Sequence, residues 1–269
     1  MTLADSYEAF FREFDSPLMR QIRREAYGED IGQHSWVGAE EVREDIKQLH
    51  LTSSSHLVDL GAGPCGPLTF VLASLRCRGT AVDLSPSALR VGRARAETLG
   101  VTELLTVVEG DLDEPLPFEA RSFDAALSID AILHIRDRSE LFGEVRRVLR
   151  PGGRFLLTDA GVVTGPISSE EIARRSPHGF TQFVPAGWNE RLLEEAGLRL
   201  VESRDRTADV IRNASGRLTA IRAHRVKLEA RSGAAEFEGQ VGYLETIIEL
   251  SRRRALSRVM YLAERPSSG

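Results

Sequence analysis

The chain of 269 residues has no uninterrupted apolar run that approaches the ~20 residues of a membrane-spanning helix. Its first residues, MTLADSYEAFFREFDS, are acidic and amphipathic. A secretory signal instead begins with a basic region that is followed by an apolar one. We therefore expect a cytoplasmic protein with no membrane partner.

Cysteine is scarce, and basic charge is not in excess. Only Cys65 and Cys77 occur, with no C-x-x-C pair and no nearby histidine cluster, so neither a disulfide framework nor a metal site is expected. Lys plus Arg number 35 against 40 for Asp plus Glu, which gives a formal net charge of -5. Because the basic residues are also scattered, a nucleic-acid partner is not expected.

Short runs rich in Val, Leu, Ala and Phe alternate with helix-like stretches. The runs cover 56–61, 79–84, 104–109, 123–129 and 153–159, and the helix-like stretches between them cover 67–76, 86–100 and 138–149. Strands that alternate with helices predict a parallel sheet with helices on both faces, which is an α/β, Rossmann-like class.

The segments around this unit have helical spacing and predict four regions. We expect a helical lid at 1–50, a core at 51–205, a helical cap at 206–256, and a last strand with a tail at 257–269. Two amphipathic helices, near 207–230 and 235–254, lie between two strands of the same sheet, so they should form a cap on the core. Their apolar stripes would cover the substrate or a partner subunit, and a homodimer is therefore a further expectation.

The stretch HLVDLGAGPCGPLTF, residues 56–70, contains the spacing G-x-G-x-x-G at Gly61, Gly63 and Gly66. This spacing is the fingerprint of dinucleotide-binding loops. Asp59, however, would oppose a pyrophosphate by ~1 kcal/mol or more. A ligand that presents an ammonium or a sulfonium group reverses the sign, and S-adenosylmethionine presents both without a phosphate.

Two further acids follow the next strands of the predicted sheet. Asp83 ends the second strand, where its carboxylate can accept two hydrogen bonds from a ribose diol. Asp111 follows the third strand, and with the amide of Leu112 it is placed to bind the amino edge of adenine. Acids at three successive strand ends therefore fit the same ligand.

Taken in order, the motifs VDLGAGPCG, AVDLSPSAL, GDLDEPLPF, SFDAALSIDAILHI and LRPGGRFLLTD resemble the class I S-adenosylmethionine-dependent methyltransferases over about residues 55–160. The flanks DIGQHSWVGAEE and TGPISSEEIARRSPHGFTQFVPAGWNERLLEEAGL are similar to a small-molecule branch related to sarcosine/dimethylglycine and natural-product tailoring methyltransferases. Cys65 and Gly66 depart from the commonest loop of the family.

The resemblance implies a doubly wound, seven-stranded sheet, mostly parallel with an antiparallel last strand, plus the helical cap. It also implies S-adenosylmethionine as the cofactor. The cofactor would be bordered by residues of the strand ends and of the loop before the core: Asp59, Gly61, Gly63, Asp83, Leu84, Asp111, Leu112, Asp130, Ile132, Gln33 and Trp36.

Methyl transfer from a sulfonium is an in-line displacement, so the protein mainly holds a nucleophile ~3 to 3.5 Å from the methyl carbon. His134, just after the fourth strand, is the candidate base for a nucleophile that must lose a proton. Its alternative role is a hydrogen bond to the N-terminal loop or a contact with the cofactor. Asp159, at the end of the fifth strand, would either orient a cationic or hydroxylic substrate or cap the following turn.

Aromatic and amide side chains in the flanking segments are candidates for the substrate pocket. They are Tyr27, Phe180, Phe183, Trp188 and Asn189. As a set they describe a lid over a partly aromatic cavity that excludes water. Each one taken singly also fits packing within the cap.

The function expected from these features is methylation of nitrogen, oxygen or carbon in a small organic molecule. A first alternative is a non-methylating enzyme on the same fold, such as a cofactor-bound cyclase, because a fold does not settle chemistry. An NAD-dependent oxidoreductase is disfavoured by Asp59 and by Pro64, which removes an amide donor from the loop. A module that only senses the cofactor is the remaining alternative.

Overall fold

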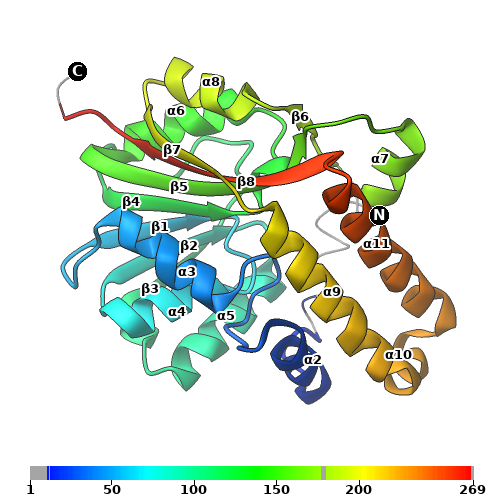
Figure 1. The fold of residues 1–269 in the computed structure, drawn as a ribbon. Helices are drawn as coiled ribbons and strands as arrows, with labels where there is room; N and C mark the ends of the chain where they lie inside the picture. The colour runs from blue at the N-terminus through cyan, green and yellow to red at the C-terminus, as the bar shows by residue number, and fades with distance from the viewer. Residues whose placement is uncertain (1–10, 12, 177–179, 268–269) are drawn as a thin grey trace.

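A single central sheet organises the chain in the computed structural model, which describes residues 11, 13–176 and 180–267 (Figure 1). The strands run in the order β3-β2-β1-β4-β5-β8-β7, and a short β6 pairs with β5. Their bounds are β1 His56–Leu60, β2 Arg78–Asp83, β3 Leu105–Glu109, β4 Phe123–Ile129, β5 Leu149–Val163, β6 Val184–Pro185, β7 Arg199–Asp205 and β8 Leu256–Glu264.

The pairing confirms the predicted α/β class. Strands β1 to β5 pair in parallel, whereas β8 is antiparallel to both β5 and β7. Two details differ from the prediction: β6 adds a short strand beyond the seven, and β5 covers 149–163 rather than 153–159. The longer β5 is explained by its position, because it pairs with β4 on one side and with β8 on the other.

Helices cover both faces of the sheet (Figure 1). On one face lie α3 (Ala39–Asp45), α4 (Gly66–Leu75) and α5 (Pro86–Thr98), and on the other lie α6 (Arg138–Val148) and α8 (Trp188–Glu195). Helix α5 begins where the sequence supplies a cap, because the Ser85 hydroxyl accepts a hydrogen bond from the Ala88 amide at 3.2 Å and Pro86 occupies the first helical position.

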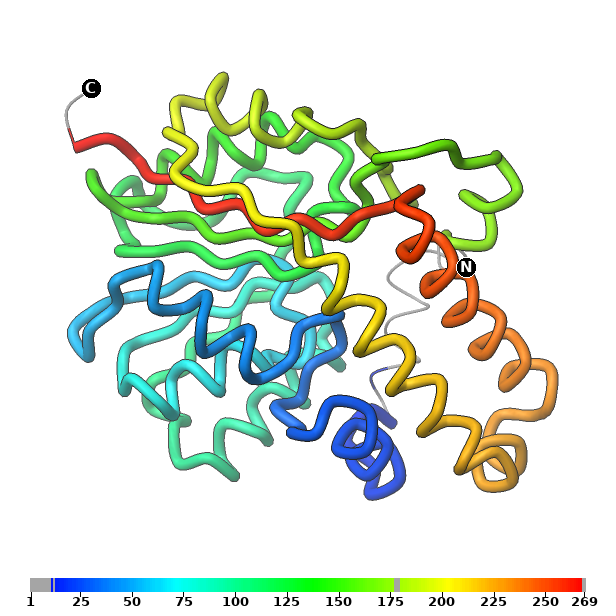
Figure 2. Tube along the Cα trace, viewed as in Figure 1, coloured from blue at the N-terminus to red at the C-terminus, as the bar shows by residue number. Residues whose placement is uncertain are grey.

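The remaining helices extend beyond one end of the sheet (Figure 2). They are α2 (Pro17–Tyr27), α7 (Ser169–Arg175), α9 (Thr207–Ala223), α10 (Arg225–Ser232) and α11 (Ala234–Arg252). The single helix expected near 207–230 is therefore two, and the break falls at His224. The His224 Nε2 atom lies 2.9 Å from Glu25 Oε2, so the break faces α2.

The apolar stripes of the cap helices are largely covered within the chain. Leu228, Val241, Leu244 and Ile248 are buried in a cluster that also contains Ile22 of α2 and Trp36. Val226, by contrast, is 81% exposed. In the part of the chain that the structure describes, no helix combines the length and the apolar character needed to cross a membrane.

Candidate functional site

A cavity of about 350 Å³ opens at the carboxyl ends of β1, β2, β3 and β4. The strand order reverses between β1 and β4, and such a point is where ligands bind in open parallel sheets. Its wall consists of residues 61–64, 83–85, 110–113, 129–131 and 134–136, together with Phe11, His34, Ser35, Asp59, Pro67 and Phe180.

Asp59, near the end of β1, is a buried carboxyl group in this wall. Burial, and secondly the charge of Asp83, raise the pKa of Asp59 to about 8. Among the described residues, none donates a hydrogen bond to the Asp59 carboxyl oxygens. A buried acid in this state is stabilised by a positively charged partner, so the wall favours a cationic ligand at this point.

Backbone conformation and close contacts explain why glycines follow β1. Gly61 has a φ of 72°, and a Cβ there would lie 2.4 Å from the Cβ of Ala131. Gly63 also has a positive φ, and its amide donates to Asp83 Oδ2 at 2.7 Å. A Cβ on Gly66 would lie 2.2 Å from the carbonyl oxygen of Gly32. The departure at Gly66 therefore allows the loop before the core to pack against the start of α4.

Asp83 is oriented by two backbone donors. Its Oδ2 accepts the Gly63 amide at 2.7 Å, and its Oδ1 accepts the Ser85 amide at 2.9 Å. Each carboxylate oxygen can accept a further hydrogen bond, which suits it to a diol. Leu84, also in the wall, is 42% exposed and offers an apolar surface next to the carboxylate.

The loop after β3 contributes two acids rather than one. Asp111 Oδ1 accepts the Asp113 amide at 3.0 Å, and Asp113 Oδ1 accepts the Arg136 amide at 2.7 Å. Arg136 also lies with its guanidinium carbon 4.9 Å from the ring centroid of Phe180. Asp113 and Arg136 were not among the predicted site residues, although the second acid is visible in GDLDEP.

Asp130, after β4, collects donors from three distant parts of the chain. Its Oδ2 accepts the Trp36 amide at 3.0 Å from the loop before the core. Its Oδ1 accepts the Thr158 hydroxyl at 2.8 Å from β5 and Arg258 Nε at 2.7 Å from β8. Asp130 has a φ of 53°, a conformation that these contacts help to hold.

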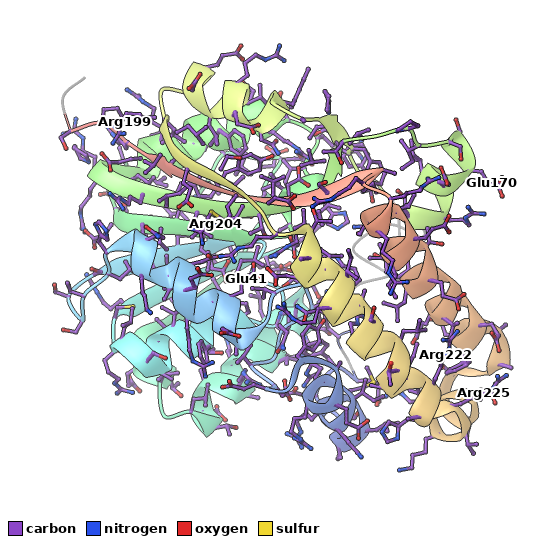
Figure 3. All side chains as sticks on the ribbon, viewed as in Figure 1. Glu41, Glu170, Arg199, Arg204, Arg222 and Arg225 are labelled. Carbon is purple, nitrogen blue, oxygen red and sulfur yellow. The ribbon has the colours of Figure 1, made fainter. Side chains whose placement is uncertain are left out.

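Arg258 connects this acid to a second one, Glu41 of α3. Its Nη1 lies 2.6 Å from Glu41 Oε1, and both side chains are buried. Figure 3 places Glu41 where α3 approaches the start of α9. Burial outweighs Arg258 and raises the pKa of Glu41 to about 7, and Glu41 Oε2 has no hydrogen-bond partner among the described residues. The only sequence signal for Arg258 was an arginine within the apolar strand LSRVMYLAE.

His134 ends the short helix η3 (Ile132–His134) and lies in the cavity wall. Its Nδ1 lies 2.9 Å from the carbonyl oxygen of Phe180. A carbonyl oxygen can only accept, so Nδ1 carries the proton and Nε2 carries the lone pair. His134 therefore contacts the segment after β5. With Nδ1 protonated, the neutral ring is the tautomer of a general base.

Comparison with known proteins identifies the central part of the chain. Residues 58–157 match the family described as "Methyltransferase domain". The chain contains a methyltransferase domain. This domain spans β1 to the middle of β5 and provides most of the cavity wall.

Relatives extend the similarity beyond the methyltransferase domain. Methyltransferase GfsG of Streptomyces halstedii is 28% identical over 165 residues, which are 59% of this chain and 58% of the relative. This chain spans less than two thirds of the length of the curated relatives that it matches.

Two of the solved structures that resemble this chain illustrate the shared fold. A putative sarcosine dimethylglycine methyltransferase from Galdieria sulphuraria has a TM-score of 0.78, with 21% identity over 98% of this chain and 99% of that chain. The [4+2]-cyclase SpnF has a TM-score of 0.75, with 18% identity over 99% and 97%.

Two predicted site residues lie outside the cavity of the methyltransferase domain. Asp159 is fully buried, with its Oδ2 2.6 Å from Arg138 Nη1 and 2.9 Å from Asn189 Nδ2. Its Oδ1 accepts the Gly161 amide at 2.7 Å. Both carboxylate oxygens are thus engaged within the protein. Asp159 and Asn189 therefore belong to a structural ion-pair cluster rather than to the cavity wall. The Gly161 contact is the turn cap that was the alternative expectation for Asp159.

Three predicted cofactor contacts also lie behind the wall. Gln33 is buried and holds its own loop, since its Oε1 accepts the Ile31 amide at 2.9 Å and its Nε2 donates to the Glu29 carbonyl oxygen at 3.1 Å. Ile132 is buried in the core, and the Trp36 ring packs with the cap helices. The loop instead presents His34 and Ser35 to the cavity, one residue away from Gln33 and Trp36.

The predicted aromatic lid is reduced to Phe180 in this structure. Phe183 packs against Leu250 and Leu256, and Trp188 is 37% exposed on the surface with Arg191 over its ring. The Tyr27 hydroxyl donates to the Ser35 carbonyl oxygen at 2.9 Å, so it supports the wall rather than forming it. Phe183, Trp188 and Tyr27 are therefore corrected to structural positions.

Proposed function

We propose that this protein is an S-adenosylmethionine-dependent methyltransferase that acts on a small organic molecule. The observation that supports it most is Asp59, a buried acid in the wall with a raised pKa and no hydrogen-bond donor among the described residues. A cationic ligand would favour its ionised form, and a nucleotide phosphate would oppose it. The match of residues 58–157 to a methyltransferase domain supports the same conclusion.

The wall residues fit the parts of this cofactor. Asp83 would hold the ribose diol, Asp111 with the Leu112 amide would bind the adenine, and Asp59 and Asp130 would face the cationic methionine part. When bound, the cofactor supplies an electrophilic methyl group. The protein orients the acceptor, excludes water and, through His134 Nε2, accepts a proton from an acceptor that must lose one.

The regions around the core have proposed roles too. We propose that 1–50 forms a lid and 206–256 a cap over the core 51–205, with 257–269 completing the sheet; residues 1–10 and 12 lie outside the described residues. A cytoplasmic location, a homodimer and the absence of a nucleic-acid partner stay predictions. The homodimer has limited surface support, because most of the apolar cap stripe is buried within the chain.

The direct test is transfer of a labelled methyl group. The protein is incubated with methyl-labelled S-adenosylmethionine and pools of small amines, phenols and enolisable ketones, and products are sought by mass spectrometry. Label in a product supports the proposal. Binding of NAD in place of S-adenosylmethionine in equilibrium dialysis would contradict it.

A cofactor-bound cyclase is the second candidate, and the similarity to SpnF over nearly the whole chain favours it. The same incubation distinguishes the two candidates. A cyclase would rearrange a substrate of unchanged mass while all of the label stays in the cofactor.

Replacing Asp83 by alanine is expected to weaken binding of S-adenosylmethionine by ~1 to 3 kcal/mol, because charge-assisted hydrogen bonds to the ribose are lost. Isothermal titration calorimetry measures this change directly. Glu109→Ala is the matched control, since Glu109 pairs with Asp83 in the sheet register but lies outside the cavity wall. Equal affinities for the Asp83 variant and the parent protein would contradict the ribose assignment.

Replacing Asp59 by asparagine is expected to remove a pH dependence of cofactor binding. The pKa of Asp59 is about 8 in the free protein, and a bound cation lowers it, so binding releases a proton. Affinity of the parent protein should therefore rise with pH by up to about tenfold per unit and level off above about pH 8. The variant should lack this rise, and calorimetry across that range compares the two.

Asp59→Asn is also expected to change how folding stability depends on pH. In the parent protein, stability should fall as pH rises, whereas cofactor affinity should increase. A raised pKa in the folded state means that the folded protein keeps a proton that the unfolded chain releases, so its stability falls as pH rises from about 4 to about 8. Without ligand, Asp59→Asn should therefore be more stable than the parent near pH 8. A less stable variant with the parent's pH slope for binding would show that Asp59 has another role.

A further inference from the structure

One buried arginine lacks the carboxylate partner that the others have. Four arginines are buried in the described part of the chain: Arg23, Arg138, Arg175 and Arg258. Arg23 pairs with Asp15 and Asp30. Arg138 pairs with Asp159, and Arg258 pairs with Glu41 and Asp130. Arg175, at the end of α7, is 6% exposed and has no described carboxylate within 4.0 Å.

The contacts that Arg175 does make are weak for a buried charge. Its Nη1 donates to the Tyr243 hydroxyl at 3.0 Å, and its guanidinium carbon lies 5.6 Å from the centroid of the same ring. A guanidinium keeps its charge in proteins, so it cannot escape the cost of burial by losing a proton. Burial of a charge without an ion-pair partner is strongly unfavourable. An anionic ligand would remove this cost.

The surroundings of Arg175 form a small pocket. The pocket has a volume of about 10 Å³, and its wall includes the hydroxyl residues Ser251 and Ser257 and aliphatic side chains such as Val210 and Ile247. The next residue along the chain, Ser176, has a buried hydroxyl oxygen with no hydrogen-bond partner among the described residues. A charged donor of the pocket wall and an unsatisfied hydroxyl outside that wall are thus adjacent in sequence.

This pocket is the neighbour of the cavity in the methyltransferase domain. Trp36 and Arg258 both belong to the wall of the pocket, and both donate to Asp130, which belongs to the wall of the cavity. Trp36 and Arg258 therefore separate the pocket of Arg175 from the cavity beside Asp130. The pocket has room for only about one water molecule, so occupation requires α7 and α11, which pack together, to separate.

We propose that Arg175 determines substrate specificity by binding an oxyanion, a carboxylate or a phosphate, at the end of the methyl acceptor remote from the reacting atom. The apolar body of that acceptor lies against Trp36 and the aliphatic wall of the pocket. This proposal rests on the proposed function, because the reacting end of the molecule must lie at the cavity beside Asp130.

The test measures thermal unfolding of the full chain with and without S-adenosylhomocysteine. The probes are phenylacetate, its neutral analogue phenylacetamide, and phenyl phosphate, each at about 10 mM so that weak binding still shifts the melting temperature. We expect at least one of the two anions to raise the melting temperature of the parent protein and the amide to leave it unchanged. Whether carboxylate or phosphate gives the larger shift identifies the oxyanion.

Two variants assign the effect to Arg175. In Arg175→Met the anion should bind at least tenfold more weakly, whereas in Arg174→Met it should bind as in the parent protein. Arg174 is the matched control because it is adjacent in the chain, 51% exposed and paired with Glu170. Retained binding of S-adenosylhomocysteine shows that each variant is folded. Without anion, Arg175→Met should also be at least as stable as the parent, because it removes an unpaired buried charge.

The outcomes separate this proposal from the one on which it rests. Binding of S-adenosylhomocysteine with no anion effect in the parent protein, or with an anion effect that persists in Arg175→Met, would overturn the role of Arg175 alone. A failure of the parent to bind S-adenosylhomocysteine would overturn the proposed function. In that case, the shift in melting temperature that the anions cause without S-adenosylhomocysteine decides whether Arg175 binds an oxyanion.

Discussion

Replacing Arg258 by methionine is expected to lower the free energy of unfolding by about 3 to 5 kcal/mol, because it leaves two buried acids without their cation. Arg258 is fully buried and is shared by Glu41 and Asp130. The variant should also bind S-adenosylmethionine more weakly, since Asp130 lies in the cavity wall and loses a partner that orients it. Chemical denaturation measures the first effect and calorimetry the second.

The control for this prediction is Arg199→Met. Arg199 pairs with Glu264 in the same sheet, but it is 59% exposed and lies toward the C-terminal end of β8 (Figure 3). Exposed ion pairs contribute little, so the control should lose less than about 1 kcal/mol. The double variant Arg258→Met/Glu41→Gln should recover part of the loss, because it removes one of the unpaired acids. A loss of the same size in the Arg199 and Arg258 variants would contradict the buried network.

Replacing His134 by asparagine is expected to lower kcat by about 10²- to 10⁴-fold, the usual contribution of a general base, while leaving cofactor affinity unchanged. The choice of asparagine follows from the geometry. Its side-chain amide can replace Nδ1 as donor to the Phe180 carbonyl oxygen, but it has no counterpart to the Nε2 lone pair. Steady-state kinetics, with calorimetry for the cofactor, measures both quantities once an acceptor has been identified.

A second substitution distinguishes a base from a structural histidine. His134→Ala removes both the hydrogen bond to Phe180 and the lone pair. If His134 is the base, both variants are slow, and both lose the rise in kcat with pH on the acidic side of the profile. If His134 only holds Phe180 in the wall, asparagine restores most of the activity that alanine removes, and the assignment is wrong.

The sheet and its ligand edge were predictable because their signals are local in the sequence. These signals all lie within about 75 residues, 56–130. They are apolar runs of strand length, a glycine loop, and an acid at or just after the end of each successive strand. The carboxyl ends of parallel strands must meet at one edge, so the sequence alone places Asp59, Asp83, Asp111 and Asp130 together, and all four lie in the cavity wall.

The contacts that were missed or wrongly assigned depend on distant parts of the chain. Asp159 has the same sequence signal as Asp83, an acid near the end of a strand, yet Arg138 and Asn189 surround it and remove it from the cavity. Nothing local in the sequence distinguishes these two situations. The loop before the core posed a related difficulty, since it has no regular periodicity that would indicate whether Gln33 or His34 faces the ligand.

Three chain segments meet at Asp130, and this limits how the protein can be re-engineered. A chimera that exchanges only the helices 207–252 for those of a relative would keep Arg258, Thr158 and Trp36, and so would keep the cofactor edge intact. A chimera whose junction lies beyond β8 would take residue 258 from the other parent. Glu41 would then lose its cationic partner wherever that residue is not arginine. Grafts aimed at new acceptors should therefore join the two parents between α11 and β8.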